Sequence, residues 1–352
     1  MPRVIYSVHP DDLQAQILAA GFKAFRFRQL MQWLYFKAIN DLAAMTDLSA
    51  DFKQFLTENY SFALPEIVQS LTAKDKSTKF VLKLADGELI ECVLMPEGEK
   101  NTLCISSQVG CAFGCVFCAT GKLGAIRDLT VDEIVAQIII AKQFLKDEKL
   151  TNLVFMGMGE PLDNLENVVP AIRILQSDYG LQFSPRRMTV STSGYVPKMY
   201  ELAETGIRVK LAVSLNSAIN DKRDEIMPIN KMYNLSDLKK AILSFRKQSP
   251  WRITLEYIMI PDFNMGEEDV RALLKFAGDI SCKLNLIPYN EVEGFPWRSP
   301  ALRESMAFQD RLRGLPIAAI IRKSRGTDIS AACGQLAAQN KVAQDSDLAT
   351  KK

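Results

Sequence analysis

Cys111-Ala-Phe-Gly-Cys115-Val-Phe-Cys118 places three thiols within eight consecutive residues, with the spacing C-x3-C-x2-C. Three thiolates from one loop can bind a [4Fe–4S] cluster through three of its irons and leave the fourth iron open to a small molecule. A closed structural zinc site prefers four ligands, usually in two separated pairs. The only histidine, His9, lies far away in the sequence, so the pattern favours the cluster, with zinc as the alternative.

Apolar runs of strand length alternate with amphipathic runs of helical length from about residue 101 onward. Repeated strand–helix units of this kind predict a parallel sheet covered by helices. Upstream, Asp86-Gly87 separates two alternating apolar runs, which predicts a β-hairpin. Residues 11 to about 60 carry apolar side chains at helical intervals and are predicted to be helical. The strands are expected at 102–106, 152–156, 187–191, 209–215, 253–260, 283–287 and 318–322, and the helices at 131–144, 167–176, 196–204, 235–247 and 269–278.

The composition is typical of a soluble globular protein, since 48% of the residues are hydrophobic and 24% are charged. No apolar run reaches the length of a membrane span, and the N-terminus shows no signal-peptide pattern, so we expect a cytoplasmic protein that does not bind membranes. Seven irregularly spaced cysteines do not suit a secreted disulfide framework. The net charge of +2 is too small to indicate nucleic-acid binding by itself, and any RNA contact must come from local basic patches.

Five motifs follow one another along the chain: Leu103-Cys-Ile-Ser-Ser-Gln-Val-Gly-Cys111, Met156-Gly-Met-Gly-Glu-Pro-Leu162, Arg186-Arg-Met-Thr-Val-Ser-Thr-Ser-Gly194, Met227-Pro-Ile-Asn230 and Asp328-Ile-Ser-Ala-Ala-Cys-Gly-Gln-Leu336. In sequence and order they resemble the RlmN/Cfr family of radical S-adenosylmethionine (SAM) enzymes, which methylate adenine in RNA. The resemblance covers nearly the whole chain. Within the family, Pro161, Ser193 and Arg322-Lys-Ser-Arg-Gly326 look more like RlmN than like Cfr.

The resemblance implies an α/β fold whose sheet curls into the radical SAM partial (β/α)6 barrel, with an N-terminal helical accessory domain and a small β-hairpin element. We expect residues 1–62 to form the helical, RNA-binding accessory domain and residues 63–100 to form the β-hairpin linker region. Residues 101–336 would form the barrel core, and residues 337–352 a polar, flexible tail. In such a barrel, functional residues lie where strands end and loops begin, and the five motifs fall at such ends.

The resemblance also assigns a cofactor site. Cys111, Cys115 and Cys118 are expected to bind one [4Fe–4S] cluster per chain, and SAM would chelate its open iron. Two SAM molecules would be used per turnover. Asn216 departs from the family, which usually has histidine at this position; its amide can form hydrogen bonds but cannot titrate near neutral pH. The residues expected to hold SAM at neighbouring strand ends are Gly159, Glu160, Ser191, Ser214, Leu215, Asn216 and Asn290.

Cys104 and Cys333 match the family's pair of catalytic thiols. Carbon 2 of adenine is electron-poor and cannot attack SAM as a nucleophile, so the methyl group must take another route. The resemblance implies that Cys333 accepts a methyl group from one SAM and that a radical from a second SAM removes hydrogen from it. The resulting carbon radical adds to adenine, and Cys104 attacks the sulfur of Cys333, closing a disulfide and releasing the base. Glu91 occupies the position of the proton acceptor, although the residues alone fit a solvent-facing strand glutamate equally well.

The resemblance implies methylation at carbon 2 of adenine 2503 in 23S rRNA and of adenine 37 in tRNA, by a monomer that receives electrons from a flavodoxin-type reductant. The alternatives are Cfr-like methylation at carbon 8, a non-methylating radical SAM enzyme and a metal-stabilised RNA-binding module. The last two would leave the Cys104 and Cys333 pair without a use. Cys92 and Cys282 lie in apolar runs and are expected to be buried, inert thiols. Basic residues that could contact RNA are Lys23, Arg26, Arg28, Lys37, Lys74, Lys76, Lys79, Lys122, Arg127, Arg186, Arg187, Arg322, Lys323 and Arg325.

Overall fold

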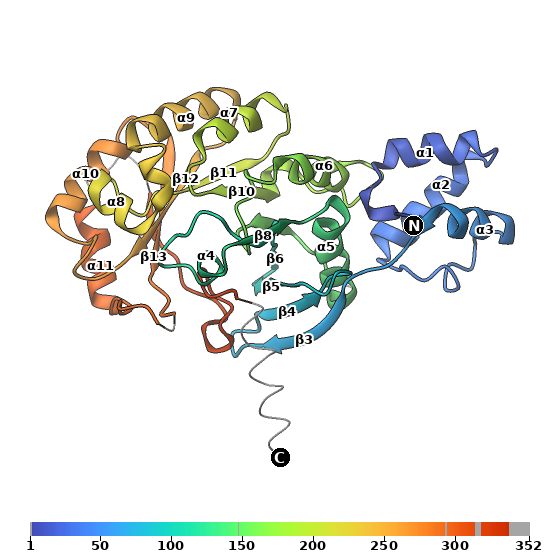
Figure 1. Cartoon of the computed structure of the whole chain (residues 1–352), viewed down its shortest axis with the longest axis horizontal. Coiled ribbons are helices and arrows are strands. Elements are labelled where there is room, and N and C mark those ends of the chain that lie inside the picture. Colours follow the sequence, from blue (N-terminus) through green and yellow to red (C-terminus); the bar gives the residue numbers. More distant parts are fainter. Residues whose placement is uncertain (1, 147, 293, 314–317, 338–352) are drawn as a thin grey trace, which may run out of the picture.

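The computed structural model describes residues 2–146, 148–292, 294–313 and 318–337. It consists of a helical N-terminal region, a three-stranded antiparallel segment and an open parallel barrel (Figure 1). In the described part of the chain, no helix is both long and apolar enough to cross a bilayer. The flexible tail expected at 337–352 lies outside the described residues, apart from Ala337.

The N-terminal region is helical, as its apolar spacing predicts. Phe27, Leu30 and Leu34 recur at helical intervals and are fully buried, so one face of these helices forms a small core. His9 caps the first helix, because its Nδ1 atom accepts a hydrogen bond from the Asp11 amide at 3.3 Å. The region contains β1 (Arg3–Val4), η1 (Ile5–Ser7), α1 (Pro10–Ala19), α2 (Ala24–Met31), the π-helix η2 (Gln32–Phe36), α3 (Ala50–Asn59) and β2 (Tyr60–Ser61).

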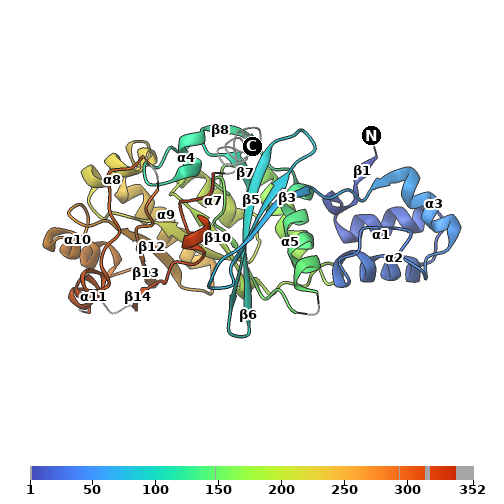
Figure 2. The same ribbon diagram turned by 90° about the horizontal axis from the view of Figure 1, so that it is seen from below.

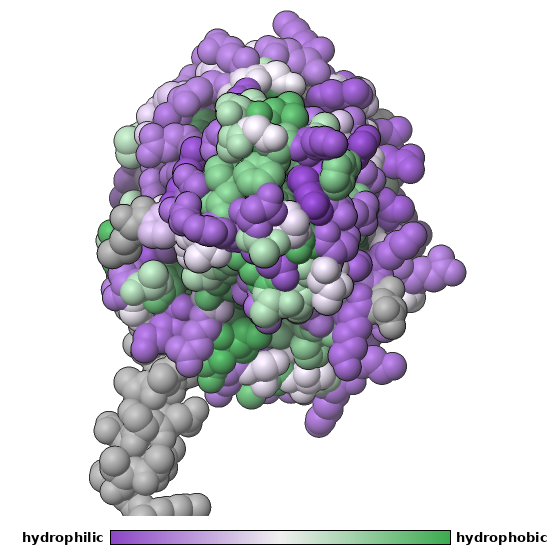
Figure 3. All heavy atoms as spheres, turned by 90° about the vertical axis from the view of Figure 1, so that its right-hand side faces the viewer, coloured by the Kyte–Doolittle hydropathy of each residue, from purple (hydrophilic) through white to green (hydrophobic). Residues whose placement is uncertain are grey.

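These helices form one end of the molecule and are joined to the barrel helix α5 (Val131–Leu145), where Lys142 donates to the Tyr35 carbonyl at 2.6 Å (Figures 1 and 2). Their outer face shows apolar side chains surrounded by hydrophilic ones (Figure 3). Large apolar side chains that are exposed in this region include Leu18, Phe25 and Phe36.

The hairpin predicted at Asp86-Gly87 joins β4 (Thr78–Lys83) to β5 (Leu89–Glu97), with Lys83 paired to Leu89. A further strand, β3 (Glu66–Thr72), pairs with β4 at the edge of the sheet. The sequence does not reveal β3, because an edge strand with mostly exposed side chains lacks a strong apolar alternation. On the other side, β5 pairs antiparallel with the first barrel strand, so the three strands extend the barrel sheet.

The barrel confirms the predicted alternation of strands and helices. Its strands run parallel and in sequence order, and the sheet stays open because β14 and β3 form its two edges. The strands are β6 (Lys100–Cys104), β9 (Asn152–Phe155), β10 (Met188–Thr192), β11 (Lys210–Ser214), β12 (Ile253–Met259), β13 (Cys282–Pro288) and β14 (Ala319–Ile321).

Helices follow each of the first six parallel strands, which gives the expected partial (β/α)6 barrel. In this topology all carboxyl ends of the strands meet at one rim, where the loops leave the sheet. The helices are α5 (Val131–Leu145), α6 (Leu165–Gln176), α7 (Val196–Glu204), α8 (Asn220–Ile226), α9 (Leu235–Gln248), α10 (Glu267–Ala277) and α11 (Leu302–Arg311), and short 3-10 turns are η3 (Pro185–Arg187), η4 (Pro228–Lys231) and η5 (Thr327–Ile329).

Candidate active site

The loop that carries the three cysteines is braced at both ends. Before it lies β7 (Gln108–Gly110), and after it lie α4 (Ala119–Leu123) and β8 (Ala125–Asp128), which pairs antiparallel with β7. The Cys111 amide donates to the Gly124 carbonyl at 2.8 Å. Gly110 has φ +77°, and a Cβ atom there would lie 1.9 Å from the Gly124 oxygen. Only glycine therefore allows the two sides of the loop to meet so closely.

Cys111, Cys115 and Cys118 are partly buried. Burial raises the pKa of the Cys111 thiol to about 12 and raises the pKa of Cys115 well above its usual value. Ionised Cys118 would raise both values further, which shows that the thiols lie within electrostatic reach of one another. A bound cation is what would make three thiolates stable here, because metal binding displaces their protons.

The three thiols fit a cluster better than a single ion. Among the described residues, no three His, Cys, Asp or Glu side chains are grouped closely enough to hold one metal ion. A [4Fe–4S] cluster binds its cysteines on different irons, so its ligands lie farther apart than those of one ion. Three thiols on a single short loop, spaced C-x3-C-x2-C, match this donor set.

Glu160 joins the loop after β9 to the loop after β10 at the barrel rim. Its carboxylate accepts hydrogen bonds from the Ser193 amide at 2.7 Å, the Ser193 hydroxyl at 2.8 Å and the Leu162 amide at 3.2 Å. Burial raises its pKa, and these hydrogen bonds oppose that effect. Gly159 has φ +97°, and a Cβ atom there would lie 2.5 Å from the side chain of Gln108. The glycine thus lets the loop after β9 approach the loop after β6.

Ser191, Ser214 and Asn290 lie at the carboxyl ends of three other strands, as the sequence predicts. Each is partly exposed, so its polar group can meet a ligand. Asn290 donates its side-chain amide to the carbonyl of Cys333 at 3.2 Å. This hydrogen bond attaches the segment that carries Cys333 to the end of β13.

Leu215 and Asn216 are turned into the protein. Leu215 is fully buried, and Asn216 is 1% exposed with φ +55°. The Asn216 side-chain oxygen accepts from the Ile258 amide at 3.0 Å, and its nitrogen donates to the sulfur of Met227 at 3.3 Å. Both ends of the amide therefore have protein partners, and a SAM contact through this side chain would have to displace one of them.

The fold places Cys104 and Cys333 within electrostatic reach of each other, although 229 positions separate them in the sequence. Cys104 ends β6 and is buried, whereas Cys333 is exposed in the loop after η5. Burial raises the pKa of Cys104, and ionised Cys333 would raise it further, so the two thiols lie within electrostatic reach of each other. Desolvation by the surrounding protein raises the pKa of Cys333 to about 11 even though the residue is exposed to solvent.

The segment around Cys333 packs directly on the cysteine loop. The amide of Ala119, which follows Cys118, donates to the Gly334 carbonyl at 2.7 Å. The Thr120 hydroxyl donates to the Leu336 carbonyl at 2.7 Å. The Cys333 segment is therefore held beside the three cysteines by hydrogen bonds from α4 to its main-chain carbonyls.

Glu91 lies on β5 and forms a buried ion pair with Lys79 of β4, with 2.9 Å between Oε1 and Nζ. Both side chains are almost completely buried, so the solvent-facing interpretation of Glu91 is wrong. The expectation that Lys79 contacts RNA is also wrong, because its side chain is buried and cannot reach a phosphate group. The pair also reaches the Cys333 segment, because Lys79 donates to the Ser330 carbonyl at 3.3 Å and Glu91 accepts from the Ala337 amide at 3.0 Å.

Other expected RNA contacts are engaged within the protein. Arg127 forms a two-point ion pair with Glu133 at 2.8 Å and contacts Asp86 at 2.6 Å. Arg325 pairs with Glu97 at 3.4 Å. Arg186 and Arg187 lie in η3, before β10 begins, and thus at the opposite end of the barrel from the strand carboxyl ends. Basic residues that remain exposed include Lys23, Arg28, Lys37, Lys74, Lys76, Lys122, Arg322 and Lys323.

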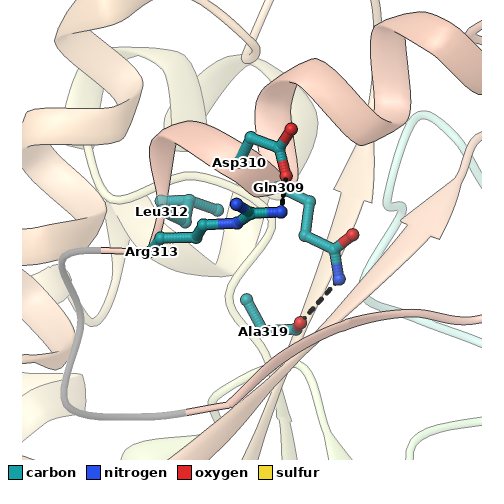
Figure 4. Close-up of a pocket in the computed structure, with 5 residues that line it drawn as sticks. All are labelled: Gln309, Asp310, Leu312, Arg313 and Ala319. Atoms are coloured by element: carbon teal, nitrogen blue, oxygen red, sulfur yellow. Dashed lines mark hydrogen bonds and ion pairs between the residues drawn. The ribbon is translucent and has the colours of Figure 1, made fainter.

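Cys92 and Cys282 are buried, as predicted for inert thiols. A surface pocket lined by Gln309, Asp310, Leu312, Arg313 and Ala319 lies between the end of α11 and the start of β14 (Figure 4). It is at the barrel end opposite the cysteines, because β14 begins there. Its charges are paired, with 2.8 Å between Asp310 and Arg313, and it contributes nothing to the site described above.

Arg223 of α8 was not predicted from the sequence. It stands in Asn220-Asp-Lys-Arg-Asp-Glu, which is typical of an exposed charged turn, yet Arg223 is fully buried. The sequence feature that could have indicated its burial is the apolar Ile226 three residues later, because this spacing places both residues on one face of a helix.

Comparison with known proteins agrees with this geometry. Residues 105–277 match the radical SAM superfamily, and residues 5–61 match the ribosomal RNA large subunit methyltransferase N-terminal domain. The chain is 45% identical to the dual-specificity RNA methyltransferase RlmN of Desulfotalea psychrophila, with 92% of each chain covered. It is 45% identical to that of Magnetococcus marinus, covering 90% of this chain and 89% of the relative. A crystal structure of a radical SAM methyltransferase from Sphaerobacter thermophilus matches with a TM-score of 0.91 and 37% identity, covering 96% of this chain and all of that one.

Proposed function

Because this chain belongs to the RlmN family of radical SAM RNA methyltransferases, we propose that it methylates carbon 2 of adenine 2503 in 23S rRNA and of adenine 37 in tRNA. The observation that carries the proposal is the packing of the Cys333 segment on the loop of three cysteines, with Cys104 within electrostatic reach of Cys333. An enzyme that only cleaved SAM would need that loop but not the two additional thiols.

Cys111, Cys115 and Cys118 would hold one [4Fe–4S] cluster, which when bound supplies the electron that cleaves SAM. Glu160 offers a carboxylate to the amino group of SAM, and its position is fixed by Ser193. Ser191, Ser214 and Asn290 would contact the carboxylate and ribose, with Gly159 allowing close approach of the backbone. Leu215 and Asn216 would support this rim from inside, through the contacts that bury them.

Cys333 would act first as a nucleophile. Its thiol must lose a proton before the sulfur can attack the methyl group of one SAM. After a second SAM has supplied the radical that removes hydrogen from this methyl group, Cys333 presents the carbon to the adenine. The adduct formed by this addition must lose one electron and the proton of carbon 2, and the cluster, oxidised when SAM is cleaved, would be the acceptor for that electron. Cys104, as thiolate, would then attack the sulfur of Cys333; the disulfide forms as the carbon–sulfur bond breaks, and the released carbon takes up a proton to become the methyl group. Exposure of Cys333 and burial of Cys104 suit this order, since only Cys333 must reach the base.

Glu91 would take the proton that leaves carbon 2. Its two oxygens face Lys79 and the Ala337 amide, so one of these contacts must open for the base to approach. The Ala337 contact is the one that RNA can displace, because Ala337 belongs to the same segment as Cys333. Lys79 would keep the carboxylate in place while that segment moves.

The substrates would be held by exposed basic side chains. Lys74 and Lys76 precede β4, and Arg322 and Lys323 follow the carboxyl end of β14. The N-terminal helices would add phosphate contacts through residues such as Arg28. With rRNA and tRNA as substrates, the enzyme would work in the cytoplasm as a monomer. A flavodoxin-type protein would supply the electrons for SAM cleavage, and a reductant would reopen the disulfide between Cys104 and Cys333.

The test is the chemical identity of the product. Reconstituted protein is incubated with SAM, a reductant and either a 23S rRNA fragment or tRNA, and the RNA is digested to nucleosides for chromatography and mass spectrometry. The proposal predicts 2-methyladenosine from both RNAs. A product carrying the methyl group at carbon 8 would assign the Cfr-like reaction instead, and methylation of only one RNA would remove the dual specificity.

A further inference from the structure

Arg223 of α8 is the largest completely buried side chain among the described residues. Its Nη2 atom donates to the Ser193 carbonyl at 2.6 Å and to the Ser214 carbonyl at 3.1 Å, and its Nε atom donates to the Leu215 carbonyl at 3.0 Å. Its Nη1 atom donates to the side-chain oxygen of Asn230 at 2.9 Å. The guanidinium group therefore holds the ends of β10 and β11 together at the rim of the site.

All of these acceptors are neutral. Among the described residues, no carboxylate forms an ion pair with Arg223. Burial lowers the pKa of Arg223 to about 10, so the group still carries its charge at neutral pH. Asp224 acts on this charge electrostatically but reaches it only through Asn230, whose amide donates to the Asp224 carboxylate at 2.6 Å. A buried charge without a directly bonded counter-charge is costly. The other deeply buried cation, Lys79, has its carboxylate partner Glu91 at 2.9 Å, so this chain does provide counter-ions elsewhere.

The cysteine loop lies next to Arg223 and could supply the negative charge that compensates it. The Val116 amide donates to the carbonyl of Ile226 at 3.1 Å, which joins the loop to the last turn of the helix that carries Arg223. Cys115 and Val116 pack on an apolar cluster that contains Ile226.

We propose that Arg223 is a positioning residue that compensates the negative charge of the thiolate-bound cluster and favours its reduced form. The inference rests on the proposed function, because it requires a [4Fe–4S] cluster on Cys111, Cys115 and Cys118. Three thiolates give the bound cluster a net negative charge, and reduction adds one more. In a buried site a nearby fixed positive charge stabilises the more negative form, since electrostatic interactions are stronger there than in water. The same guanidinium group orients the strand-end carbonyls of the SAM site.

The experiment is a redox titration of the reconstituted holoenzyme, followed by electron paramagnetic resonance of the reduced cluster. Arg223→Met removes the charge and keeps an extended side chain of similar length. We expect the ratio of reduced to oxidised cluster at a fixed potential to fall about tenfold, which corresponds to about 59 mV for a one-electron couple. The matched control is Lys222→Met on the same helix, because Lys222 is already paired with Glu268 at 2.8 Å and Asp269 at 2.9 Å. The control should stay within about threefold of the unmodified enzyme.

A role limited to the hydrogen bonds at the strand ends predicts a different pattern. Arg223→Lys keeps the charge but cannot reproduce the hydrogen bonds, whereas Arg223→Gln keeps some hydrogen bonds and loses the charge. The inference predicts that the lysine variant keeps the reduced fraction of the cluster and that the glutamine variant loses it. This comparison does not depend on whether Arg223→Met folds. Equal behaviour of these two variants, or an unchanged ratio in Arg223→Met, would overturn it.

A second measurement uses stability instead of redox state. Loading the cluster should raise the melting temperature of the unmodified protein more than that of Arg223→Met, because only the former gains charge compensation on loading. A purely structural arginine would lower the melting temperature equally with and without the cluster, and that outcome would contradict the inference. If the unmodified protein bound no iron at all, the proposed function would fail. If it bound iron and Arg223→Met matched it in both measurements, only this inference would fail.

Discussion

Lys79→Met should destabilise the protein strongly. Lys79 lies on β4, almost completely buried, with its Nζ atom 2.9 Å from the Glu91 carboxylate of β5. Without Lys79 the carboxylate keeps its burial and loses its counter-charge, which costs about 3–5 kcal/mol in comparable buried pairs. The hydrogen bond to the Ser330 carbonyl is lost as well and contributes about 1 kcal/mol. We therefore expect the free energy of unfolding to fall by about 4–6 kcal/mol.

The assay is urea unfolding of the purified protein, followed by far-ultraviolet circular dichroism. Lys83→Met is the matched control, because Lys83 ends the same strand and is exposed; its effect should stay within about 0.5 kcal/mol. The double variant Lys79→Met, Glu91→Leu replaces both charges by apolar groups and should recover at least about half of the loss. The reasoning would be refuted if Lys79→Met cost less than about 1 kcal/mol, or if the double variant were no more stable than the single one.

Three further predictions concern the site. Replacing Cys111, Cys115 or Cys118 singly by serine should reduce the iron and sulfide content of anaerobically purified protein to background, and full iron content in any of these variants would exclude that residue as a ligand. The pKa of Cys333 is raised to about 11, so the rate of its alkylation by iodoacetamide should increase about tenfold per pH unit between pH 7 and 10. Mass spectrometry of the Cys333 peptide measures this rate, and a rate that stops increasing below pH 9 would contradict the prediction. Glu160→Gln should weaken SAM binding at least about tenfold in calorimetry, or ~1.4 kcal/mol, because an amide cannot replace the carboxylate that we propose to bind the SAM amino group. An unchanged affinity would remove Glu160 from the proposed SAM site.

The barrel could be predicted from the sequence because its signals are local. Runs such as 253–260 and 283–287 have the apolar character of buried strands, and each lies between helical repeats. The Asp86-Gly87 turn sets the β4–β5 register by itself. The three cysteines likewise form one short motif, so their grouping needs no knowledge of the fold.

The polar interior could not be predicted, because it depends on contacts between distant residues. Lys79 and Glu91 occur in strands where alternation gives no sign that both are buried, and the Ala337 amide lies 246 positions beyond Glu91. Arg223 has the sequence context of a surface charge, and its acceptors are carbonyls, which any residue carries. The motifs reveal where the chemistry is, whereas the charges that support it become visible only after the chain has folded.

The adjacency of Cys104 and Cys333 is most directly tested by the fate of the Cys104→Ala variant. In the proposed mechanism, the bond between Cys333 and the adenine can be broken only by the Cys104 thiol. Cys104→Ala, purified with bound cluster, should therefore accumulate RNA covalently linked to the protein, visible as a retarded band on denaturing gels and as a nucleotide-modified Cys333 peptide. The double variant Cys104→Ala, Cys333→Ala should show no such band. A folded, cluster-loaded Cys104→Ala protein that forms no covalent RNA adduct, or that still releases methylated RNA, would contradict the two-thiol mechanism.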